Sequence, residues 1–172
     1  MQEVILVDEN DQEIGTEEKL KAHQIGKLHR AFSIFVLNAH NELLIQKRAA
    51  IKYHSGNLWT NTCCSHPSPG DNIEDAIHIR LQEEMGFDCE LKFLFKFIYK
   101  TEFNNGLTEH ELDYVYLGRY NADPVPDQAE VGDWKWINLG DLKEDIQKNP
   151  EKYTFWFNHI FNQIYDRIKD DL

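Results

Sequence analysis

Two apolar runs separated by a polar turn constrain the fold of this chain most strongly. They are FSIFVL at residues 32–37 and LLIQKR at residues 43–48, with a turn at 38–41 between them. Short runs rich in aromatic and branched residues on both sides of an Asn-containing turn are typical of a β-hairpin. Comparable runs predict further strands at 4–7, 59–63, 91–99, 112–120 and 133–138. A chain of this kind must build a sheet, and other elements must cover its apolar faces.

Four segments are predicted to be helices: 16–22, 73–85, 140–148 and 151–169. Thr16 is the expected N-cap of the first helix, and Gly86 is expected to end the second. The last helix carries one apolar stripe, formed by Tyr153, Phe157, Ile160, Ile164 and Ile168. Because strands outnumber helices and the helices are placed to cover two faces of a mixed sheet, we expect an α/β (α+β) fold, arranged as an α/β/α sandwich.

The composition limits the possible partners. The chain has 172 residues and no Pro/Gly-rich linker, so we expect one domain over residues 1–172. The net charge of −12 argues against a nucleic-acid or anionic-membrane partner, because either normally requires a basic face. Three cysteines, two of them adjacent, make no disulfide framework, and there is no apolar stretch of the ~20 residues that a membrane span requires. A cytoplasmic location is therefore expected, and an anionic substrate would need a local basic cluster or a metal.

The segment TNTCCSHP at residues 60–67 is the first candidate for chemistry. Cys64 and His66 are two residues apart, so at the end of a strand both side chains would lie on one face. A nearby cation or metal lowers the pKa of a thiol from ~8.5 and makes it usable in acid–base or nucleophilic chemistry. The alternative is that Cys63 and Cys64 are small buried hydrophobes and His66 is a turn residue.

Glu109 and Glu111 form a second candidate, with His110 between them. On an extended strand the two carboxylates would point to one side and His110 to the other. Two carboxylates that close repel each other unless they share a cation or a proton. The alternative is a solvated acidic edge.

Two histidines near the predicted second strand complete a possible ligand set. His23, His29 and His66 offer three nitrogens, and Glu109 and Glu111 offer oxygens. Such an N3O2 set suits Zn, Mn or Fe, with a sixth position open to water or substrate. The other histidines are interpreted as surface or core polar residues: His40, His54, His78, His110 and His159.

The predicted helix at 73–85 places two charged residues on its inward stripe. Ile73, Ile77, Arg80 and Glu84 follow one another at spacings of three and four residues. Arg80 and Glu84 would then lie at the inner edge of the helix. They either form an ordinary i,i+4 salt bridge or contact a phosphate or Mg²⁺.

Taken together, these segments resemble the type 1 isopentenyl-diphosphate isomerases, a family of the Nudix superfamily. The resemblance covers nearly the whole chain and is carried by KLKAH…LHRAF (19–32), LLIQKRAAIKYHSGNLWTNTCCSHP (43–67), RLQEEMGF (80–87), YKTEFNNGLTEHELDYVY (99–116) and FWF (155–157). This family converts isopentenyl diphosphate to dimethylallyl diphosphate. It protonates the terminal alkene carbon and removes a proton from the far side. The resemblance implies a Nudix-like fold and the same isomerisation, on a small-molecule diphosphate, for this chain.

The resemblance also implies roles for individual residues. Cys64 and Glu111 match the two catalytic groups that act on opposite faces of the substrate, and Tyr99 matches the tyrosine that assists the glutamate. The matched ligands of a Mn²⁺ or Zn²⁺ ion are His23, His29, His66, Glu109 and Glu111. Which of Cys64 and Glu111 protonates the substrate stays open.

A second group of residues matches the family's substrate-binding positions. Glu84 matches the ligand of a Mg²⁺ ion that bridges to the diphosphate. The basic groups around that diphosphate are matched by Lys19, Arg48, Lys52 and Arg80. Trp156 matches the aromatic residue that faces the cationic intermediate, and an electron-rich ring suits that role because a carbocation has no lone pair to bind. We expect a monomer or a weak dimer.

The Nudix hydrolase signature, G-x5-E-x7-R-E-U-x-E-E-x-G-U, is only partly present. Aligned on Gly86, its first Gly, first Glu and Arg-Glu pair are replaced by Ser65, Asp71 and Ile79-Arg80. The loss of a metal-clustering carboxylate favours an isomerase over the first alternative, a Nudix diphosphohydrolase. The second alternative is a non-catalytic metal-binding scaffold, which would have no use for the set of Cys64, Tyr99, Glu111 and Trp156.

Overall fold

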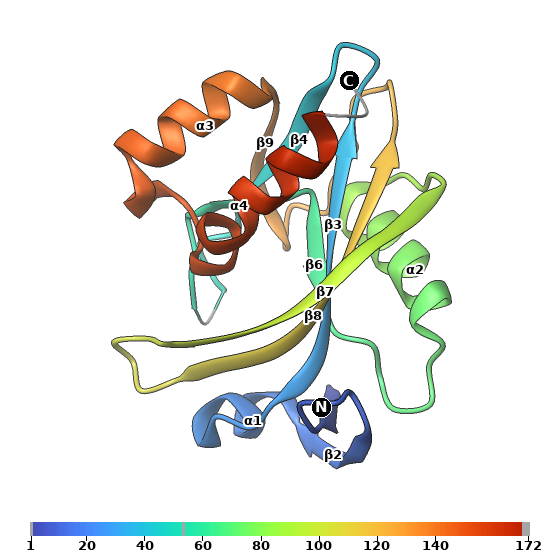
Figure 1. Cartoon of the computed structure of the whole chain (residues 1–172), viewed down its shortest axis with the longest axis vertical. Coiled ribbons are helices and arrows are strands. Elements are labelled where there is room, and N and C mark those ends of the chain that lie inside the picture. Colours follow the sequence, from blue (N-terminus) through green and yellow to red (C-terminus); the bar gives the residue numbers. More distant parts are fainter. Residues whose placement is uncertain (1, 53, 170–172) are drawn as a thin grey trace.

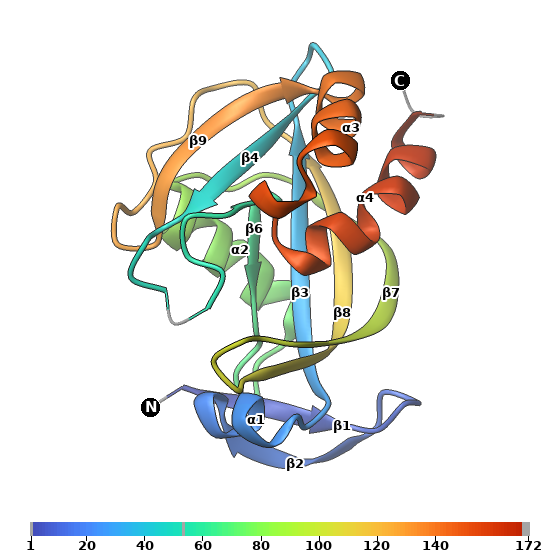
Figure 2. The ribbon, with the colours of Figure 1, turned by 90° about the vertical axis from the view of Figure 1, so that its left-hand side faces the viewer.

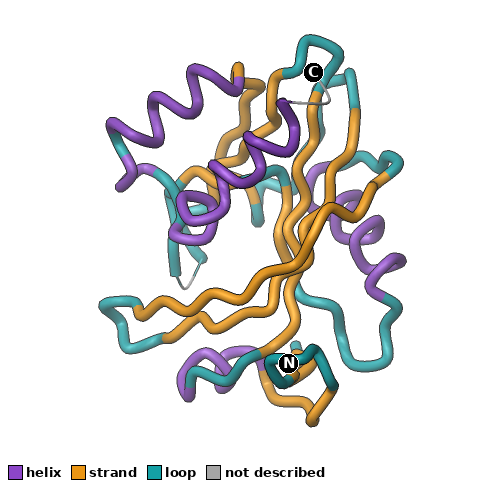
Figure 3. Tube along the Cα trace, in the orientation of Figure 1, coloured by secondary structure: helices purple, strands orange, loops and turns teal. Residues whose placement is uncertain are grey.

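Strands dominate the computed structural model, which describes residues 2–52 and 54–169 (Figures 1 and 3). The described elements are, in chain order, β1 (Glu3–Val7), β2 (Glu13–Glu18), α1 (Lys19–Ile25), β3 (His29–Leu37), β4 (Glu42–Arg48), β5 (Trp59–Thr60), β6 (Cys63–Ser65), α2 (Ile73–Met85), β7 (Leu91–Glu102), β8 (Thr108–Arg119), β9 (Val131–Asn138), α3 (Leu139–Lys148), the 3-10 helix η1 (Pro150–Lys152) and α4 (Phe155–Ile168). The prediction of one domain over 1–172 includes residues 1, 53 and 170–172, which lie outside the described part.

Strand β3 is the centre of the sheet. It pairs antiparallel with β1, β4 and β6 and parallel with β8 along its whole length, so the sheet is mixed, as predicted. β8 continues to β7, and β4 continues to β9 and β5. The register sets His29 opposite Glu111 and Ser33 opposite Cys64. β6 and β8 thus lie on opposite edges of β3 and place their side chains beside it.

Helices cover both faces of the sheet, with α3 and α4 on one side and α2 on the other (Figure 2). Alternate side chains of β3 divide between the two layers, since successive residues of a strand point to opposite faces. Phe35 packs in one core with Phe157 of α4, whereas Ile34 packs in another core with Leu81 of α2. Burial of each such side chain stabilises the fold by roughly 1.5–3 kcal/mol. The predicted α/β/α sandwich is confirmed.

Helix α2 has the predicted bounds, and both of its ends have a physical cause. The side chain of Asn72 accepts a hydrogen bond from the N–H of Glu74, which caps the first turn. Gly86 ends the helix in the left-handed conformation, with φ of 77°. A Cβ atom at Gly86 would lie 2.2 Å from the carbonyl oxygen of Val125, so the position requires glycine.

The helix predicted at 16–22 was wrong over its first three residues, which belong to the segment 13–18. This segment forms β2, which pairs antiparallel with β1, and α1 begins only at Lys19. The cap is Glu18, whose carboxylate accepts from the N–H groups of Leu20 and Lys21, and not Thr16. Most of the side chains of β2 are exposed, so the strand is held by backbone pairing and leaves no apolar pattern in the sequence.

Other boundaries also differ from the predictions, among them those of the last helix and of the strands predicted at 59–63, 91–99 and 112–120. The last helix begins at Phe155 because residues 150–152 form η1, with Pro150 at its start. Residues 59–63, predicted as one strand, are divided between β5 and β6. β7 and β8 extend three and four residues further toward their shared turn than predicted, and this extension carries Glu109 and Glu111. No helix in the described ranges is long and apolar enough to cross a membrane.

Candidate active site

A cavity of about 410 Å³ gathers most of the residues singled out in the sequence. Its walls come from α1, β3, β4, β6, α2, β7, β8 and α4 and from loops between them, so segments from both halves of the chain meet there. The predicted site residues on these walls are Lys19, Arg48, Lys52, Cys64, His66, Arg80, Glu84, Tyr99, Glu109, Glu111 and Trp156. The two remaining predicted residues, His23 and His29, are fully buried, and their Nε2 atoms lie near Glu111, which lines the cavity.

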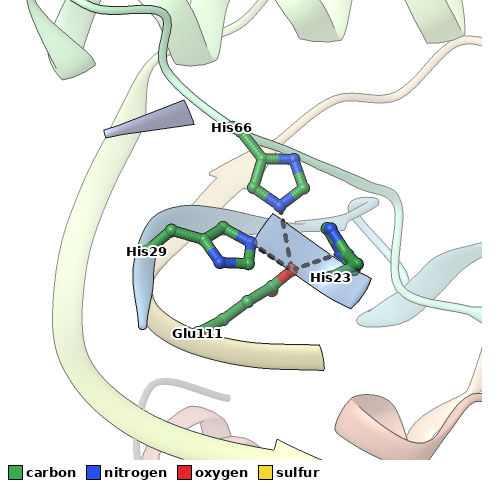
Figure 4. Close-up of side chains that lie close together, drawn as sticks. All are labelled: His23, His29, His66 and Glu111. Carbon is green, nitrogen blue, oxygen red and sulfur yellow. Dashed lines mark hydrogen bonds and ion pairs between the residues drawn. The ribbon is translucent and has the colours of Figure 1, made fainter. Parts of the chain in front are cut away.

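Three imidazole rings converge on one oxygen of Glu111 (Figure 4). The Nε2 atoms of His66, His29 and His23 lie 2.8, 3.5 and 3.9 Å from Glu111 Oε1. Each residue comes from a different part of the fold: α1, the start of β3, the segment after β6, and β8. This arrangement makes a compact, largely buried group of four possible metal ligands.

Backbone contacts fix the orientation of two of these rings. His23 Nδ1 lies 2.7 Å from the carbonyl oxygen of Lys19, and His29 Nδ1 lies 2.8 Å from that of Lys27. A carbonyl only accepts, so both Nδ1 atoms carry a proton, and in the neutral imidazole form each Nε2 atom then presents a lone pair toward Glu111. Within residues 2–52 and 54–169, His29 Nε2 is buried and lacks a hydrogen bond. Lone pairs facing a carboxylate oxygen repel it, and a cation placed among them removes the repulsion, so the residues fit a divalent metal.

The protonation states also fit metal binding. Burial, together with the positive charge of Lys19, lowers the pKa of His66 to about 3, so the imidazole is neutral near pH 7. Burial alone would raise the pKa of Glu111, but contacts with His66 and His29 outweigh it and hold the pKa well below its ordinary value. Metal ligation requires this combination of neutral imidazole and ionised carboxylate.

Glu109 shows the repulsion predicted for the two neighbouring carboxylates. Both side chains point inward, and they are 3% and 5% exposed, so the alternative of a solvated acidic edge is wrong. Burial and the charge of Glu111 raise the pKa of Glu109 well above its ordinary value. His110 faces the other way, as predicted, with Nδ1 3.1 Å from the carbonyl oxygen of Gly26.

The structure adds one histidine to the site. His54 is buried, lines the cavity, and forms with His23 and Glu109 a second group of possible metal ligands that overlaps the first. Its Nε2 lies 3.5 Å from Glu109 Oε1. The interpretation of His54 as a residue unrelated to the site was therefore wrong. Residues 49–52 and 54–58, between β4 and β5, lack helix and strand, so no periodic pattern in the sequence indicates where His54 lies.

Cys64 reaches the cavity from β6 and Tyr99 from β7. Burial raises the pKa of Cys64 to about 12, so the group is a thiol near neutral pH. Tyr99 donates a hydrogen bond of 2.7 Å to Glu111 Oε2, the oxygen that the histidines do not approach. The neighbouring Cys63 is fully buried in the core beneath α2, in agreement with its interpretation as a structural residue.

Basic side chains surround the rest of the cavity. Arg80 Nη2 pairs with Glu84 Oε2 at 2.8 Å, which confirms the i,i+4 salt bridge. Gln46 donates to the other oxygen of Glu84 at 2.7 Å, and Lys52 pairs with Glu130. The guanidinium of Arg48 lies 5.3 Å from the ring centre of Trp156, whose Nε1 donates to Asn61. Four basic side chains thus line the cavity of a chain of net charge −12, and two of them pair with carboxylates that line it as well.

Comparisons with known proteins decide the family. The NUDIX domain family matches residues 27–157. A relative from Aromatoleum aromaticum, named Isopentenyl-diphosphate Delta-isomerase 2, is 54% identical over 94% of this chain and 86% of its own length. Another relative of the same name, from Photorhabdus laumondii, is 51% identical over 97% of this chain and 95% of its own length. The chain belongs to the isopentenyl-diphosphate Delta-isomerases.

Solved structures support the fold of this isopentenyl-diphosphate Delta-isomerase family member. A Deinococcus radiodurans protein, DR0079, superposes with a TM-score of 0.80 at 18% identity, covering 95% of this chain and 99% of that one. At this identity the likeness concerns the fold alone. The Nudix-like fold and the family resemblance expected from the sequence are both confirmed.

The family assignment also explains the incomplete Nudix signature on α2. Where a Nudix hydrolase has the Glu of the Arg-Glu pair, this isomerase has Arg80, which neutralises Glu84 by the ion pair described above. Ile79, at the position of the Arg, is 57% exposed and lines the cavity. At positions 79 and 80 the helix therefore presents an apolar and a positive group to the cavity, while the carboxylates of Glu83 and Glu84 still line it.

Proposed function

We propose that this chain interconverts isopentenyl diphosphate and dimethylallyl diphosphate. In this reaction one proton is added to the terminal alkene carbon and another is removed from the carbon on the other side of the branch, so the double bond moves by one position. The observation that carries the proposal is the placement of a thiol and a buried carboxylate on the walls of one cavity. The reaction breaks no bond to phosphorus.

Cys64 and Glu111 are the two proton-transfer groups. They stand on β6 and β8, which pair with the two opposite edges of β3, so they reach the cavity from separate strands. Because the reaction is reversible, the group that donates in one direction accepts in the other. Tyr99 donates a 2.7 Å hydrogen bond to Glu111, so it fixes the orientation of this carboxylate. Its O–H dipole also stabilises the ionised form of the carboxylate.

The cavity also provides for the cationic intermediate. Protonation of the alkene leaves a tertiary carbocation, which no lone-pair donor can bind without forming a bond. Trp156 is 4% exposed and lines the cavity, and its indole N–H is held by Asn61. An electron-rich ring next to a desolvated cation contributes ~2 kcal/mol or more. We assign this role to Trp156.

Lys19, Arg48, Lys52 and Arg80 are the proposed ligands of the diphosphate. All four line the cavity. Together they offer four positive charges to a group that a chain of net charge −12 would otherwise repel. Glu84 would hold a Mg²⁺ ion, which would supply further positive charge between the protein and the diphosphate.

His23, His29, His66, Glu109 and Glu111 are the proposed ligands of a Mn²⁺ or Zn²⁺ ion. When bound, the ion withdraws electron density from Glu111 and so makes its protonated form a stronger acid. The geometry that supports this proposal is the convergence of three Nε2 atoms on Glu111 Oε1. We further propose a cytoplasmic enzyme, acting as a monomer or weak dimer, without nucleic-acid or membrane partners.

A product assay tests the proposal. Purified protein with Mg²⁺ and Mn²⁺ is incubated with isopentenyl diphosphate, and the acid-labile allylic product is separated from the acid-stable substrate. We expect dimethylallyl diphosphate and no released phosphate. Release of phosphate or of a monophosphate, from this substrate or from nucleoside diphosphate derivatives, would instead indicate a Nudix diphosphohydrolase.

A further inference from the structure

His54 is held rigidly beside the metal centre. It is 8% exposed, stacks on Phe103 with ring centres 4.9 Å apart and planes 15° apart, and meets the ring of Trp156 edge to face at 6.2 Å. Aromatic neighbours on two sides leave the imidazole little freedom to rotate. The direction of its nitrogens is therefore set by packing.

The two ring nitrogens of His54 have partners of opposite kind. Nδ1 lies 3.3 Å from the hydroxyl of Ser55, and Nε2 lies 3.5 Å from Glu109 Oε1. A carboxylate that binds a metal is ionised and only accepts, whereas a hydroxyl can donate, so the assignment consistent with metal binding has Ser55 donating to Nδ1 and Nε2–H pointing at Glu109. A shift of a few tenths of an ångström brings the second contact to normal hydrogen-bond length.

Glu109 needs such a donor. Its side chain is 3% exposed, and its Oε2 atom is buried without a hydrogen bond in the described part of the chain. The adjacent ligand, Glu111, has one oxygen directed at the histidines and the other held by Tyr99. A corresponding arrangement at Glu109 would have one oxygen held by His54 and the other facing the cation.

We propose that His54 is a positioning residue of the metal centre, whose Nε2–H holds Glu109 Oε1 and leaves Oε2 available to the metal. The inference rests on the proposed metal site of His23, His29, His66, Glu109 and Glu111, and it adds a residue outside that set. Hydrogen-bonding partners of metal ligands fix the ligand's orientation, and their loss typically weakens metal binding 10–100-fold.

Direct titration of metal-free protein with Mn²⁺ tests the inference, with free Mn²⁺ followed by electron paramagnetic resonance. His54→Phe keeps a ring to stack on Phe103 but has no N–H, and we expect it to weaken Mn²⁺ binding roughly 10–100-fold. His54→Gln offers an amide N–H and should bind within a few fold of the wild-type chain. His78→Gln is the matched control, because His78 is partly exposed and pairs with Asp88 on the outer side of α2, and it should bind as the wild type does.

A double-mutant cycle with Glu109→Gln shows whether His54 acts through Glu109. In the Glu109→Gln background, His54→Phe should cause little further loss of Mn²⁺ affinity. An equal loss in both backgrounds, or wild-type affinity in His54→Phe, would overturn the inference. Circular dichroism of the metal-free variants checks that each is folded. A wild-type chain that binds neither Mn²⁺ nor Zn²⁺ would overturn the proposed metal site itself, which is a separate and recognisable result.

Discussion

The hydroxyl of Tyr99 donates a 2.7 Å hydrogen bond to Oε2 of Glu111. The other oxygen of the same carboxylate faces the imidazole nitrogens, the nearest of them on His66 at 2.8 Å. The two oxygens of one side chain therefore have different partners, and in the proposed site Oε1 would bind the metal while Oε2 serves in proton transfer. Proton transfer at Oε2 can then proceed while Oε1 keeps its ligand role.

Tyr99→Phe tests this division of roles. The variant keeps the aromatic ring that stacks on Phe97 but loses the hydrogen bond to Glu111, so the fold should be preserved. We expect kcat to fall roughly 10–100-fold and Mn²⁺ affinity to change much less, measured by steady-state kinetics and metal titration. Tyr153→Phe is the control, because Tyr153 bonds to Asp145 and does not line the cavity. An unchanged kcat in Tyr99→Phe would contradict the assigned role.

Cys64→Ala should abolish turnover and leave the protein folded. The thiol is only partly buried and lies at the cavity wall, so its loss removes a proton-transfer group but little packing. Activity and the thermal unfolding midpoint are measured on the same preparation. Cys89→Ala, a thiol change outside the cavity, should retain activity. A Cys64→Ala enzyme that remains active would rule out the thiol as a catalytic group.

Removal of divalent metal should lower stability as well as activity. A ligand present at one hundred times its Kd stabilises the folded state by about 2.7 kcal/mol, which in a chain of this size raises the melting temperature by roughly 5–10 °C. We expect this increase when Mn²⁺ or Zn²⁺ is added to chelator-treated protein. Mg²⁺ alone should give much less, because Mg²⁺ prefers oxygen ligands and three of the ligands here are imidazoles. Metal-independent turnover would contradict the proposed site.

The environment of Asp11, away from the active site, should make the free energy of unfolding depend on pH. Burial alone would raise the pKa of Asp11, but hydrogen bonds from Tyr114, Lys96 and Arg30 outweigh it and hold the pKa below its ordinary value. The folded state thus favours the ionised form. This contribution to stability is present above the ordinary Asp pKa of ~3.9 and is lost as pH falls through the folded-state pKa.

The corresponding variant is Asp11→Asn. Asparagine tolerates the positive φ of 64° at this position, so the turn should keep its shape. At pH 7 we expect a loss of about 1.5–3 kcal/mol in the free energy of unfolding, measured by urea denaturation. The difference from the wild-type chain should shrink as the pH falls below about 4. Glu9→Gln, an exposed neighbour, should show little change at either pH, whereas a pH-independent loss in Asp11→Asn would contradict the ionic explanation.

The sequence predicted those parts of the fold where local chemistry and tertiary packing agree. Helix α2 is an example, since the cap at Asn72 and the stop at Gly86 are local features. The two-residue repeat of a strand predicted that Glu109 and Glu111 share one side opposite His110, but it did not show that this side is buried. Strand β2 was missed because backbone pairing with β1 forms it, and its exposed side chains carry no alternation.

The candidate site was predictable only in part. Nothing in the spacing of His23 and His29 shows that both reach Glu111, because helix α1 and the pairing of β3 with β8 bring them together. The residue types suggested these histidines as members of a ligand set, and the family resemblance gave the set its support. His54 was missed because packing against Phe103 and Trp156 places it, and such contacts cannot be read from a segment without regular structure.

The central claim is that two protons move at two carbons of one substrate inside this cavity. The most direct measurement is incubation of the metal-loaded chain with isopentenyl diphosphate in D₂O, followed by NMR of the recovered diphosphates. We predict dimethylallyl diphosphate with deuterium in the newly formed methyl group, and none with Cys64→Ala. Dimethylallyl diphosphate without deuterium, or phosphate release without any allylic product, would contradict the account.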